Sequence, residues 1–273
     1  GLRPTFGRVP RTGAMALSWT MDKLGPMARS AEDAALVLDA IRGPDGRDLT
    51  CVDAPFAWDP RRPLGTVRVG YVRAAFDLPA GDPNGPPAER FRHPTKPWDD
   101  AALAVLRDRL GVRLVPVALP EAPYDAMRVI LTAEAAAAFD ELTRSDRDKE
   151  LVQQGRGDWA NTFRTARFIP AVDYINANRH RLRAMQAWAT LFEGPEAVDV
   201  IVTPTQAAGL TQLTATNYTG HPAVIVPHGF RADGTPVSIT FLGGLFGEAA
   251  ALRVAAAYQA ATDFHARRPA GFA

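Results

Sequence analysis

The sequence contains a single cysteine, Cys51, and no hydrophobic run of the roughly 18 residues that a membrane-spanning helix requires. One cysteine excludes an internal disulfide framework and a zinc site made of several thiolates. Excess charge is also missing, because 31 Lys and Arg side chains nearly balance 30 Asp and Glu. We therefore expect no nucleic-acid partner and no membrane partner. The composition, 47% hydrophobic and 22% charged over 273 residues, is typical of a globular protein with a sizeable core.

Catalytic signals are equally scarce. None of the four serines lies in the Gly-x-Ser-x-Gly turn that exposes a hydrolase nucleophile: Ser18, Ser30, Ser145 and Ser238. Ser30 is better explained as a helix cap, because Asp33 three residues later completes a capping box. Cys51 has no histidine near it in the sequence. His221 and His228 flank one predicted strand seven residues apart, so their side chains should point to opposite faces. We therefore predict no catalytic residue, no metal ligand and no cofactor within this chain.

The periodicity of the chain predicts an α/β fold, a mixed central sheet flanked by helices, in a single domain over residues 1–273. Strands and helices alternate, which favours such a sheet over a barrel or a bundle. The predicted strands cover 66–72, 112–117, 198–203, 223–229 and 237–242, and the last two read as a hairpin. The predicted helices cover 31–42, 99–110, 124–142, 171–192 and 247–262. Polar loops are expected at 44–63, 79–97 and 145–165.

The predicted helix 171–192 carries an apolar stripe that should face the core: Ile175, Leu182, Met185, Ala189 and Phe192. Asn178 falls on this stripe. Either a neighbouring backbone group satisfies its amide, or the helix borders a polar cavity.

The first 29 residues form a long loop whose backbone is fixed by glycines and prolines. Its motifs, and those near the end of the chain, resemble the amidase signature family of serine hydrolases. They are Gly1-Leu-Arg-Pro-Thr-Phe-Gly-Arg-Val9, Asp22-Lys-Leu-Gly-Pro-Met-Ala-Arg-Ser-Ala-Glu-Asp-Ala-Ala35, Asn217-Tyr-Thr-Gly-His-Pro-Ala-Val-Ile-Val-Pro-His-Gly-Phe230 and Asp263-Phe-His-Ala-Arg-Arg-Pro269. The resemblance runs from Gly1 to Pro269 and implies an amidase signature fold whose N-terminal part is missing.

The resemblance also implies an activity. Family members hydrolyse a carboxamide C–N bond to a carboxylic acid and ammonia or an amine, through a Ser–cis-Ser–Lys triad and without a cofactor. In the family the two serines lie in a Gly-rich segment just before the match to Gly1, and the lysine lies earlier still. None of Lys23, Lys96 and Lys149 matches that lysine, and we interpret all three as exposed. The chain is thus expected to be the C-terminal part of an amidase, inactive by itself.

Some residues of the chain can still shape a substrate pocket. Met15 and Trp19, with Met21, lie in the most apolar part of the first loop and either line an acyl pocket or pack into the core. Asn217 either contacts substrate or satisfies local backbone groups in a turn. Asp22 and Arg29 stand at the two ends of one motif, and a structural ion pair is the favoured interpretation. Met15, Trp19 and Asn217 are the substrate-binding candidates.

Two alternatives to a stand-alone bacterial amidase remain open. The chain could be a non-catalytic subunit that complements a separate N-terminal half, or a component of a glutamine-dependent tRNA amidotransferase. Amidotransferase subunits carry an acidic residue shortly before the Asn-x-x-Gly-x-Pro segment, whereas the stretch Leu210-Thr-Gln-Leu-Thr-Ala-Thr216 has none. The expected partners are a small-molecule amide and, for assembly, a second copy in a homodimer. A cytoplasmic location is the default expectation.

Overall fold

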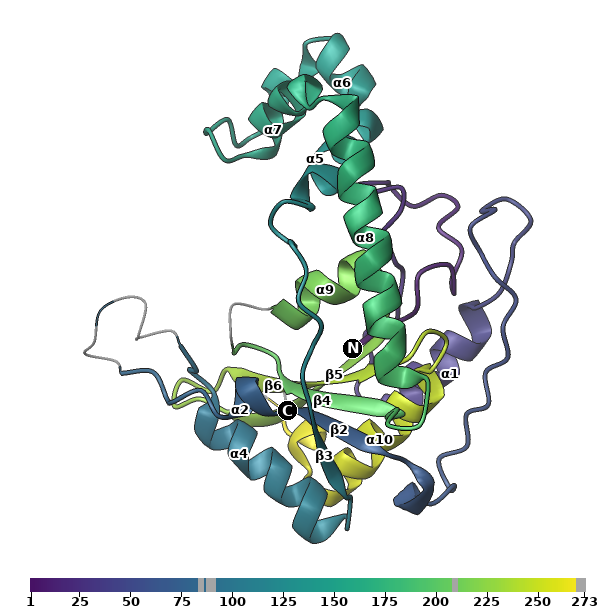
Figure 1. The fold of residues 1–273 in the computed structure, drawn as a ribbon, viewed down its shortest axis with the longest axis vertical. Helices are drawn as coiled ribbons and strands as arrows, with labels where there is room; N and C mark the ends of the chain where they lie inside the picture. Colours follow the sequence, from purple (N-terminus) through teal and green to yellow (C-terminus); the bar gives the residue numbers. More distant parts are fainter. Residues whose placement is uncertain (83–85, 87–91, 208–210, 269–273) are drawn as a thin grey trace.

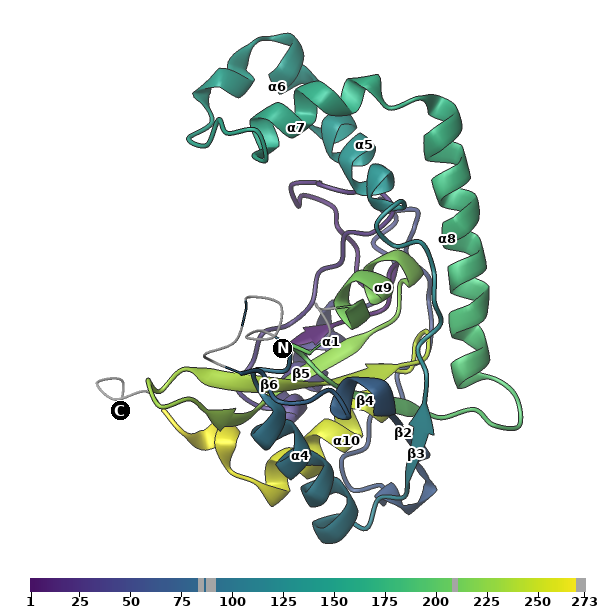
Figure 2. The same cartoon turned by 60° about the vertical axis from the view of Figure 1, so that its left-hand side comes forward.

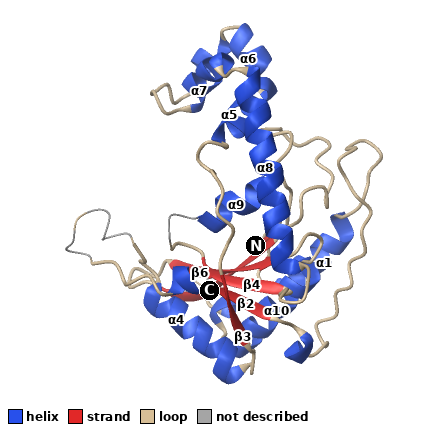
Figure 3. Ribbon diagram, viewed as in Figure 1, coloured by secondary structure: helices blue, strands red, loops and turns tan. Residues whose placement is uncertain are grey.

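The structure, a computed structural model, describes residues 1–82, 86, 92–207 and 211–268. A six-stranded mixed sheet lies at its centre, with helices on both faces (Figures 1 and 3). The strands are β1 (Leu2–Arg3), β2 (Val69–Val72), β3 (Leu114–Val117), β4 (Val200–Pro204), β5 (Ala223–Phe230) and β6 (Pro236–Gly243), in the order β1-β5-β6-β4-β2-β3. Strands β4, β2 and β3 run parallel, and the other neighbours pair antiparallel. The predicted α/β class is confirmed.

The described helices are α1 (Ala31–Ile41), α2 (Arg73–Phe76), α4 (Lys96–Ala104), α5 (Arg128–Ala138), α6 (Asp140–Arg144), α7 (Trp159–Thr165), α8 (Ala171–Phe192), α9 (Thr211–Thr219) and α10 (Glu248–Ala261). Short 3-10 turns cover Leu64–Thr66, Arg147–Glu150, Ala166–Phe168 and Phe264–Ala266, and a π turn at Val105–Arg109 continues α4. Part of the predicted loop 79–97 lies outside the described residues. The prediction of a loop over 145–165 was wrong for its last part, because residues Trp159–Thr165 form α7.

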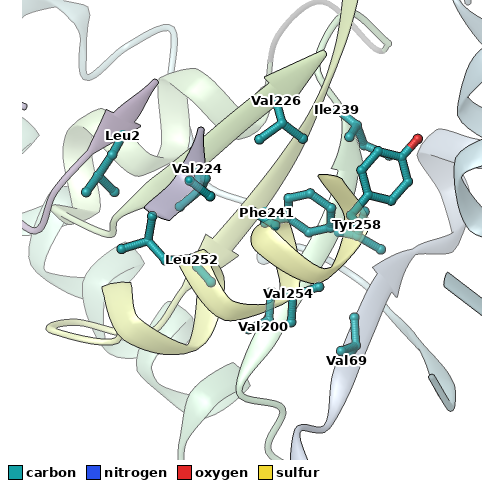
Figure 4. Close-up of a cluster of buried hydrophobic side chains, with 14 of the residues drawn as sticks. Leu2, Val69, Val200, Val224, Val226, Ile239, Phe241, Leu252, Val254 and Tyr258 are labelled. Atoms are coloured by element: carbon teal, nitrogen blue, oxygen red, sulfur yellow. The ribbon is translucent and has the colours of Figure 1, made fainter. Parts of the chain in front are cut away.

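The apolar core lies between the sheet and α10 (Figure 4). Phe241 of β6 and Tyr258 of α10 place their rings 6.1 Å apart. Around them pack fully or almost fully buried side chains, among them Leu2, Val69, Val200, Val224, Val226, Ile239, Leu252 and Val254. α1 and α4 lie on this same face, while α8 and α9 cover the other face (Figure 2). The sheet is therefore buried on both sides, as the near-continuous apolar run of β4 predicts.

Helix α8 has the predicted bounds but faces the core differently from the prediction. Ala177, Ala184 and Trp188 are its buried residues. Ile175 and Leu182 of the predicted stripe are 58% and 55% exposed. The reason is that the first half of α8 stands away from the sheet with α5, α6 and α7 in an arm, so only its second half meets the core (Figures 1 and 2). The Asn178 amide donates to the Tyr174 carbonyl at 3.1 Å, which confirms its satisfaction by a backbone group.

Two local predictions hold in detail. Ser30 caps α1 through a reciprocal capping box, in which the Asp33 amide donates to Ser30 Oγ at 2.9 Å and the Ser30 amide donates to Asp33 Oδ2 at 3.2 Å. Strands β5 and β6 form the predicted antiparallel hairpin, with a bulge between Pro227 and Gly229. Both features depend on residues close in sequence, which is why the pattern found them.

Candidate functional site

The loop that opens the chain is fixed by backbone hydrogen bonds at three points, one within the loop and two to distant segments. The Leu2 amide donates to the Pro26 carbonyl at 2.9 Å, the Phe6 amide to the Gly220 carbonyl at 3.0 Å, and the Val52 amide to the Gly7 carbonyl at 2.9 Å. Gly7 has φ +77°, and a Cβ there would lie 2.5 Å from the Thr50 carbonyl oxygen. This position requires glycine in both conformation and space. The loop is a rigid wall rather than a loose connection.

The loop closes a cavity of 440 Å³, which we call the polar pocket. The pocket lies between the first loop, the start of α5 and helix α9. Its lining residues are Leu17, Ser18, Met21, Asp22, Tyr124, Asp125, Arg128, Leu131, Thr214, Asn217 and Tyr218. Five of these eleven residues are apolar or aromatic, and the other six carry polar or charged side chains that can orient a small molecule.

Glu134 of α5 holds the loop against the arm. Its Oε2 accepts from Ser18 Oγ at 2.5 Å and from the Thr20 amide at 3.1 Å. Its Oε1 accepts from Thr20 Oγ1 at 2.8 Å and from the Tyr174 hydroxyl at 3.0 Å. The carboxylate is 7% exposed, and four hydrogen bonds compensate its burial. Glu134 therefore fixes the loop that lines the polar pocket.

Arg181 of α8 ties the same loop to α9. Its guanidinium donates to Thr20 Oγ1 at 2.5 Å, to the Thr20 carbonyl at 2.8 Å and to the Tyr218 carbonyl at 2.7 Å. Burial lowers the pKa of Arg181, with the nearby Glu134 carboxylate acting in the opposite direction. The first loop and the helices α5 and α9, which line the polar pocket, are thus joined by Glu134 and by Arg181 of α8.

Lys23 is not exposed, so that expectation was wrong. Its Nζ donates to the His221 carbonyl at 2.8 Å and to the Thr216 carbonyl at 3.2 Å. Burial is the main cause that lowers the pKa of Lys23 well below its usual value, and the neighbouring Arg3 charge adds to it. The side chain fastens the first loop to the turn between α9 and β5. The two carbonyl oxygens accept hydrogen bonds from the Lys23 ammonium group, which is a donor only.

Met15 and Trp19 line a second cavity of 530 Å³, the apolar pocket, which is separate from the one that Asn217 lines. Its lining residues are Arg11, Thr12, Ala14, Met15, Ala16, Trp19, Asp22, Lys23, Leu24, Arg47, Asp48, Leu49 and Thr50. Met15 and Trp19 are 84% and 70% exposed, so core packing does not account for them. Met21 instead packs in a buried cluster with Met127 and Ile130. Asp22 borders both pockets.

Two other predictions about polar residues were wrong. Asn217 lies within α9 rather than in a turn, and its Oδ1 accepts from the Arg3 guanidinium instead of from local backbone groups. Asp22 and Arg29 do not pair with each other. Asp22 Oδ2 accepts from the backbone amides of Leu17 and Ser18, whereas Arg29 donates to carbonyls near the end of the chain. Asp22 nevertheless has the structural role that was expected, since it shapes the loop.

Each of the four serines either has a structural hydrogen bond or lies within a strand. Ser18 is buried and donates to Glu134, Ser30 caps α1, and Ser145 donates to the Leu142 carbonyl at 3.3 Å. Ser238 lies within β6. No Ser–Lys pair and no Ser–His pair forms a hydrogen bond anywhere in the part of the chain that the structure describes.

The lone cysteine, His221 just before β5 and His228 within β5 also have structural surroundings that explain them. Burial raises the pKa of the Cys51 thiol, which disfavours the reactive thiolate. His221 packs on Trp188 of α8, while His228 Nε2 lies 2.9 Å from Asp99 Oδ1 of α4. Because α8 and α4 lie on different faces of the sheet, the two histidines point to opposite faces as predicted.

Sequence reasoning singled out Asp22 but missed the two other charged residues that line the polar pocket. Asp125 and Arg128 line it at the beginning of α5, and the side chains of both are exposed. Neither side chain makes a hydrogen bond or ion pair with a described residue. Glu134 was also missed, although a lone carboxylate within the tract Ala133–Ala138 was a signal that could have been followed.

Among the described residues, no group of three or more His, Cys, Asp and Glu side chains is arranged to hold a metal ion. Searched over the same residues, the helices include none that is long and apolar enough to cross a bilayer.

The comparisons with known proteins agree with the motifs. The model of the family described as Amidase matches residues 1–252. The chain belongs to the amidase signature family. Among its relatives are two glutamyl-tRNA(Gln) amidotransferase A subunits. That of Methylococcus capsulatus is 32% identical over 315 residues, covering 100% of this chain and 61% of the relative. That of Synechococcus sp. (strain CC9311) is 31% identical over 313 residues, covering 99% and 61%.

Solved structures give the same fold. The peptide amidase PAM in complex with the competitive inhibitor chymostatin superposes with a TM-score of 0.71 at 27% identity, covering 100% of this chain and 60% of that one. The 6-aminohexanoate cyclic dimer hydrolase in complex with its substrate has a TM-score of 0.75 at 21% identity, covering 98% and 61%. At that identity the second likeness supports the fold alone. The chain thus spans about three fifths of the length of the relatives it matches.

Proposed function

We propose that this chain is the C-terminal portion of an amide hydrolase and forms the wall of its substrate pocket. The parent enzyme would hydrolyse a carboxamide C–N bond to a carboxylic acid and ammonia or an amine. Its nucleophilic serine, bridging serine and lysine would lie on a segment that precedes Gly1. Asn217 would contribute to the polar pocket, and Met15 and Trp19 to the apolar pocket beside it.

The observation that supports the proposal most directly is the hydrogen bond that Ser18 donates to Glu134. It is the serine that lines the polar pocket, yet it is buried and its hydroxyl donates to the Glu134 carboxylate at 2.5 Å. An activated nucleophile needs a base that accepts its proton and a free path to the carbonyl carbon. Ser18 has a carboxylate partner that already accepts three other hydrogen bonds, so it serves the wall and not the reaction. A nucleophile supplied by another segment fits this arrangement.

The test compares the chain 1–273 with a longer protein translated from the upstream reading frame. We expect no ammonia release from residues 1–273 with simple carboxamides, and release from the longer protein. A Gly-rich segment with two serines should lie within about 20 residues before Gly1, and changing the second of them to alanine should abolish turnover. Amide hydrolysis by the chain alone that survives Ser18→Ala would contradict the proposal. Ser145→Ala, on the exposed side of the arm, is the matched control.

A component of a glutamine-dependent amidotransferase is the second candidate. Two observations favour it: the similarity to amidotransferase A subunits, and the Asp125 carboxylate in the polar pocket. The lack of an acidic residue before Asn217 is then a weaker argument against an amidotransferase, because the Asp125 carboxylate reaches the same pocket from the start of α5. An amidotransferase component should release ammonia from glutamine only when its partner subunits are present. A stand-alone amidase should act without them.

If no serine-containing segment precedes Gly1 in the same reading frame, this chain would be a non-catalytic subunit that complements a separate N-terminal protein. Activity should then appear only when the chain is mixed with a separate N-terminal protein. That result would keep the role of this chain as the pocket wall and change only the number of polypeptides.

A further inference from the structure

We propose that His93 is a buried imidazolium whose proton holds the segment before α4 against strand β5, so that this joint is sensitive to pH. The joint is a cluster of four polar side chains, His93, Thr95, Asp99 and His228, each at most 2% exposed. It lies on the face of the sheet that α4 covers, whereas α9 and the polar pocket belong to the other face. Its role is therefore independent of the proposed function.

Asp99, in the first turn of α4, is the centre of the cluster. Its Oδ2 accepts from Thr95 Oγ1 at 2.6 Å and lies 3.0 Å from His93 Nε2, and its Oδ1 lies 2.9 Å from His228 Nε2. Three donors on two oxygens stabilise the ionised form of the carboxylate. Within the described part of the chain, no Lys or Arg pairs with Asp99. A buried carboxylate without a compensating charge would be strongly destabilising, so the cluster needs a cation.

The hydrogen bonds of His93 show where the compensating charge lies. Its Nδ1 lies 3.1 Å from the Leu78 carbonyl oxygen, and its Nε2 lies 3.0 Å from Asp99 Oδ2. A backbone carbonyl and an ionised carboxylate can only accept, so each ring nitrogen of His93 must carry a hydrogen. An imidazole ring with both hydrogens is a cation. His93 and Asp99 together are then a neutral pair.

The same reasoning makes His228 neutral. Its Nε2 donates to Asp99, whereas its Nδ1 is buried and has no hydrogen-bond partner among the described residues. A hydrogen on this Nδ1 would be buried without an acceptor, which is costly. The geometry thus gives His228 one hydrogen, on Nε2, and leaves the positive charge to His93.

A bulge in β5 explains how His228 reaches α4. The register of β5 with β6 shifts between Pro227 and Gly229, and a bulge of this kind re-aims a side chain. At Gly229 the Trp98 ring of α4 occupies the space of a side chain, because a Cβ there would lie 2.2 Å from Trp98 Cδ1. The start of α4 therefore lies directly on β5, beside the bulge that carries His228.

Two further ionisable side chains lie next to the cluster, and neither supplies its positive charge. Burial raises the pKa of Tyr258 of α10, and the Asp99 charge adds to this rise, so the hydroxyl stays neutral. The Lys96 ammonium donates to Asp100 Oδ1 at 2.9 Å and so balances a different carboxylate. The charge balance of the cluster therefore depends on His93.

Loss of the His93 proton at high pH would break this balance. One ring nitrogen would then face the Leu78 carbonyl or the Asp99 carboxylate without a hydrogen to donate, and the carboxylate would keep an uncompensated buried charge. The joint is thus stable while His93 is charged and weakens as the pH rises.

Nitrogen-15 NMR of the histidine rings in the full chain tests the charge directly. At pH 7, where an ordinary histidine with a pKa of about 6.5 is mostly neutral, we expect two protonated nitrogens in His93 and one in His228. His180, an exposed histidine on α8, is the internal reference for a ring in contact with water. The signals are assigned by their loss in His93→Gln, His228→Gln and His180→Asn. A His93 ring with one bare nitrogen, or a doubly protonated His228, would overturn the proposal.

Asp99→Asn distinguishes a charge balance from simple packing. The variant keeps the size of the side chain but removes the negative charge, so His93 should become neutral at pH 7. Asp100→Asn is the matched control, because Asp100 is the next residue of α4, is half exposed and pairs with Lys96. This control should leave the His93 signals unchanged. A His93 ring that stays doubly protonated in Asp99→Asn would contradict the proposed pairing.

Hydrogen exchange of the wild-type chain tests the pH dependence and needs no variant to fold. The Asp99 amide donates to the Thr95 carbonyl at 3.0 Å and reports on the start of α4. After correction for the intrinsic exchange rate, its protection should fall about tenfold between pH 6.5 and pH 9, the effect of losing one charge-assisted hydrogen bond. The Ala34 amide of α1, which donates to the Ser30 carbonyl at 3.1 Å, is the reference and should keep its protection. Equal protection of the Asp99 amide at both pH values, or a parallel fall at Ala34, would overturn the proposal.

Discussion

The sheet core and the wall of the polar pocket are built by different forces. The core consists of fully buried apolar side chains such as Phe241, Ile239 and Leu252. These side chains have no polar atoms and pack without hydrogen bonds of their own. The wall is held by Glu134, Arg181 and Lys23, which bond to residues far away in the sequence. Apolar burial is non-directional and tolerates small shifts, whereas hydrogen bonds to one carboxylate fix the positions of their donors. The contrast suits a scaffold that carries a site of fixed shape.

The largest effect is expected in the core. Phe241→Ala should lower the free energy of unfolding by about 3 to 5 kcal/mol, since it removes a buried ring and leaves a cavity. Urea denaturation followed by circular dichroism measures this. Phe168→Ala removes a ring that is 86% exposed and should change stability by less than about 0.5 kcal/mol. Similar losses for the two variants would refute the assignment of the core.

A somewhat smaller effect is expected in the wall. Glu134→Ala should cost about 3 kcal/mol, because the donors from Ser18, Thr20 and Tyr174 lose their acceptor in a buried position. Glu134→Gln keeps the volume but exchanges one acceptor oxygen for an NH2 group, so it should not restore stability. Hydrogen exchange should show faster exchange of the Thr20 amide in both variants. If the Thr20 amide stays protected, Glu134 does not hold the loop.

His221 gives the wall a dependence on pH. Burial is the main cause that lowers the pKa of His221 from 6.5 to about 4 in the folded protein, and the Lys23 charge adds to it. The unfolded chain takes up a proton near pH 6.5 and the folded one does not. The stabilisation is therefore present above pH 6.5 and is lost as the pH falls toward 4, by at most about 3 kcal/mol.

Denaturation of wild type and His221→Asn at several pH values between 7 and 4.5 measures this loss. The variant should lose less stability on acidification than wild type does. His180→Asn, which changes an exposed histidine on α8, should keep the wild-type slope. An unchanged slope in His221→Asn would show that other groups cause the pH dependence.

The smallest effect is expected at a local feature outside both regions. Ser30→Ala removes the side-chain acceptor of the Asp33 amide and should cost about 1 kcal/mol. Ser30→Asp keeps an acceptor and should stay close to wild type. A loss equal to that of Glu134→Ala would mean that α1 contributes more to the fold than its capping box suggests.

Local patterns predicted a good part of the fold and little of the site. The bounds of α8, the hairpin of β5 and β6 and the cap of α1 follow from periodicity and from residues within one turn of each other. Which side of α8 is buried could not be predicted from its apolar stripe. Ile175 and Leu182 belong to the stripe but are exposed, because the first part of α8 lies in the arm away from the sheet. Met15, Trp19 and Asn217 do line cavities, but not the same one.

The sequence by itself determined the α/β class, the family and the lack of a recognisable nucleophile, because these are written in local patterns and contiguous motifs. Only the tertiary structure decided that Lys23 is partly buried, that Glu134 bonds to Ser18 and Thr20, and that Asp125 and Arg128 share a cavity with Asn217. The physical reason is distance along the chain. Ser18 and Glu134 are 116 residues apart, and Lys23 and His221 are 198 apart. A hydrogen bond over such a separation leaves no periodic trace in the amino-acid sequence.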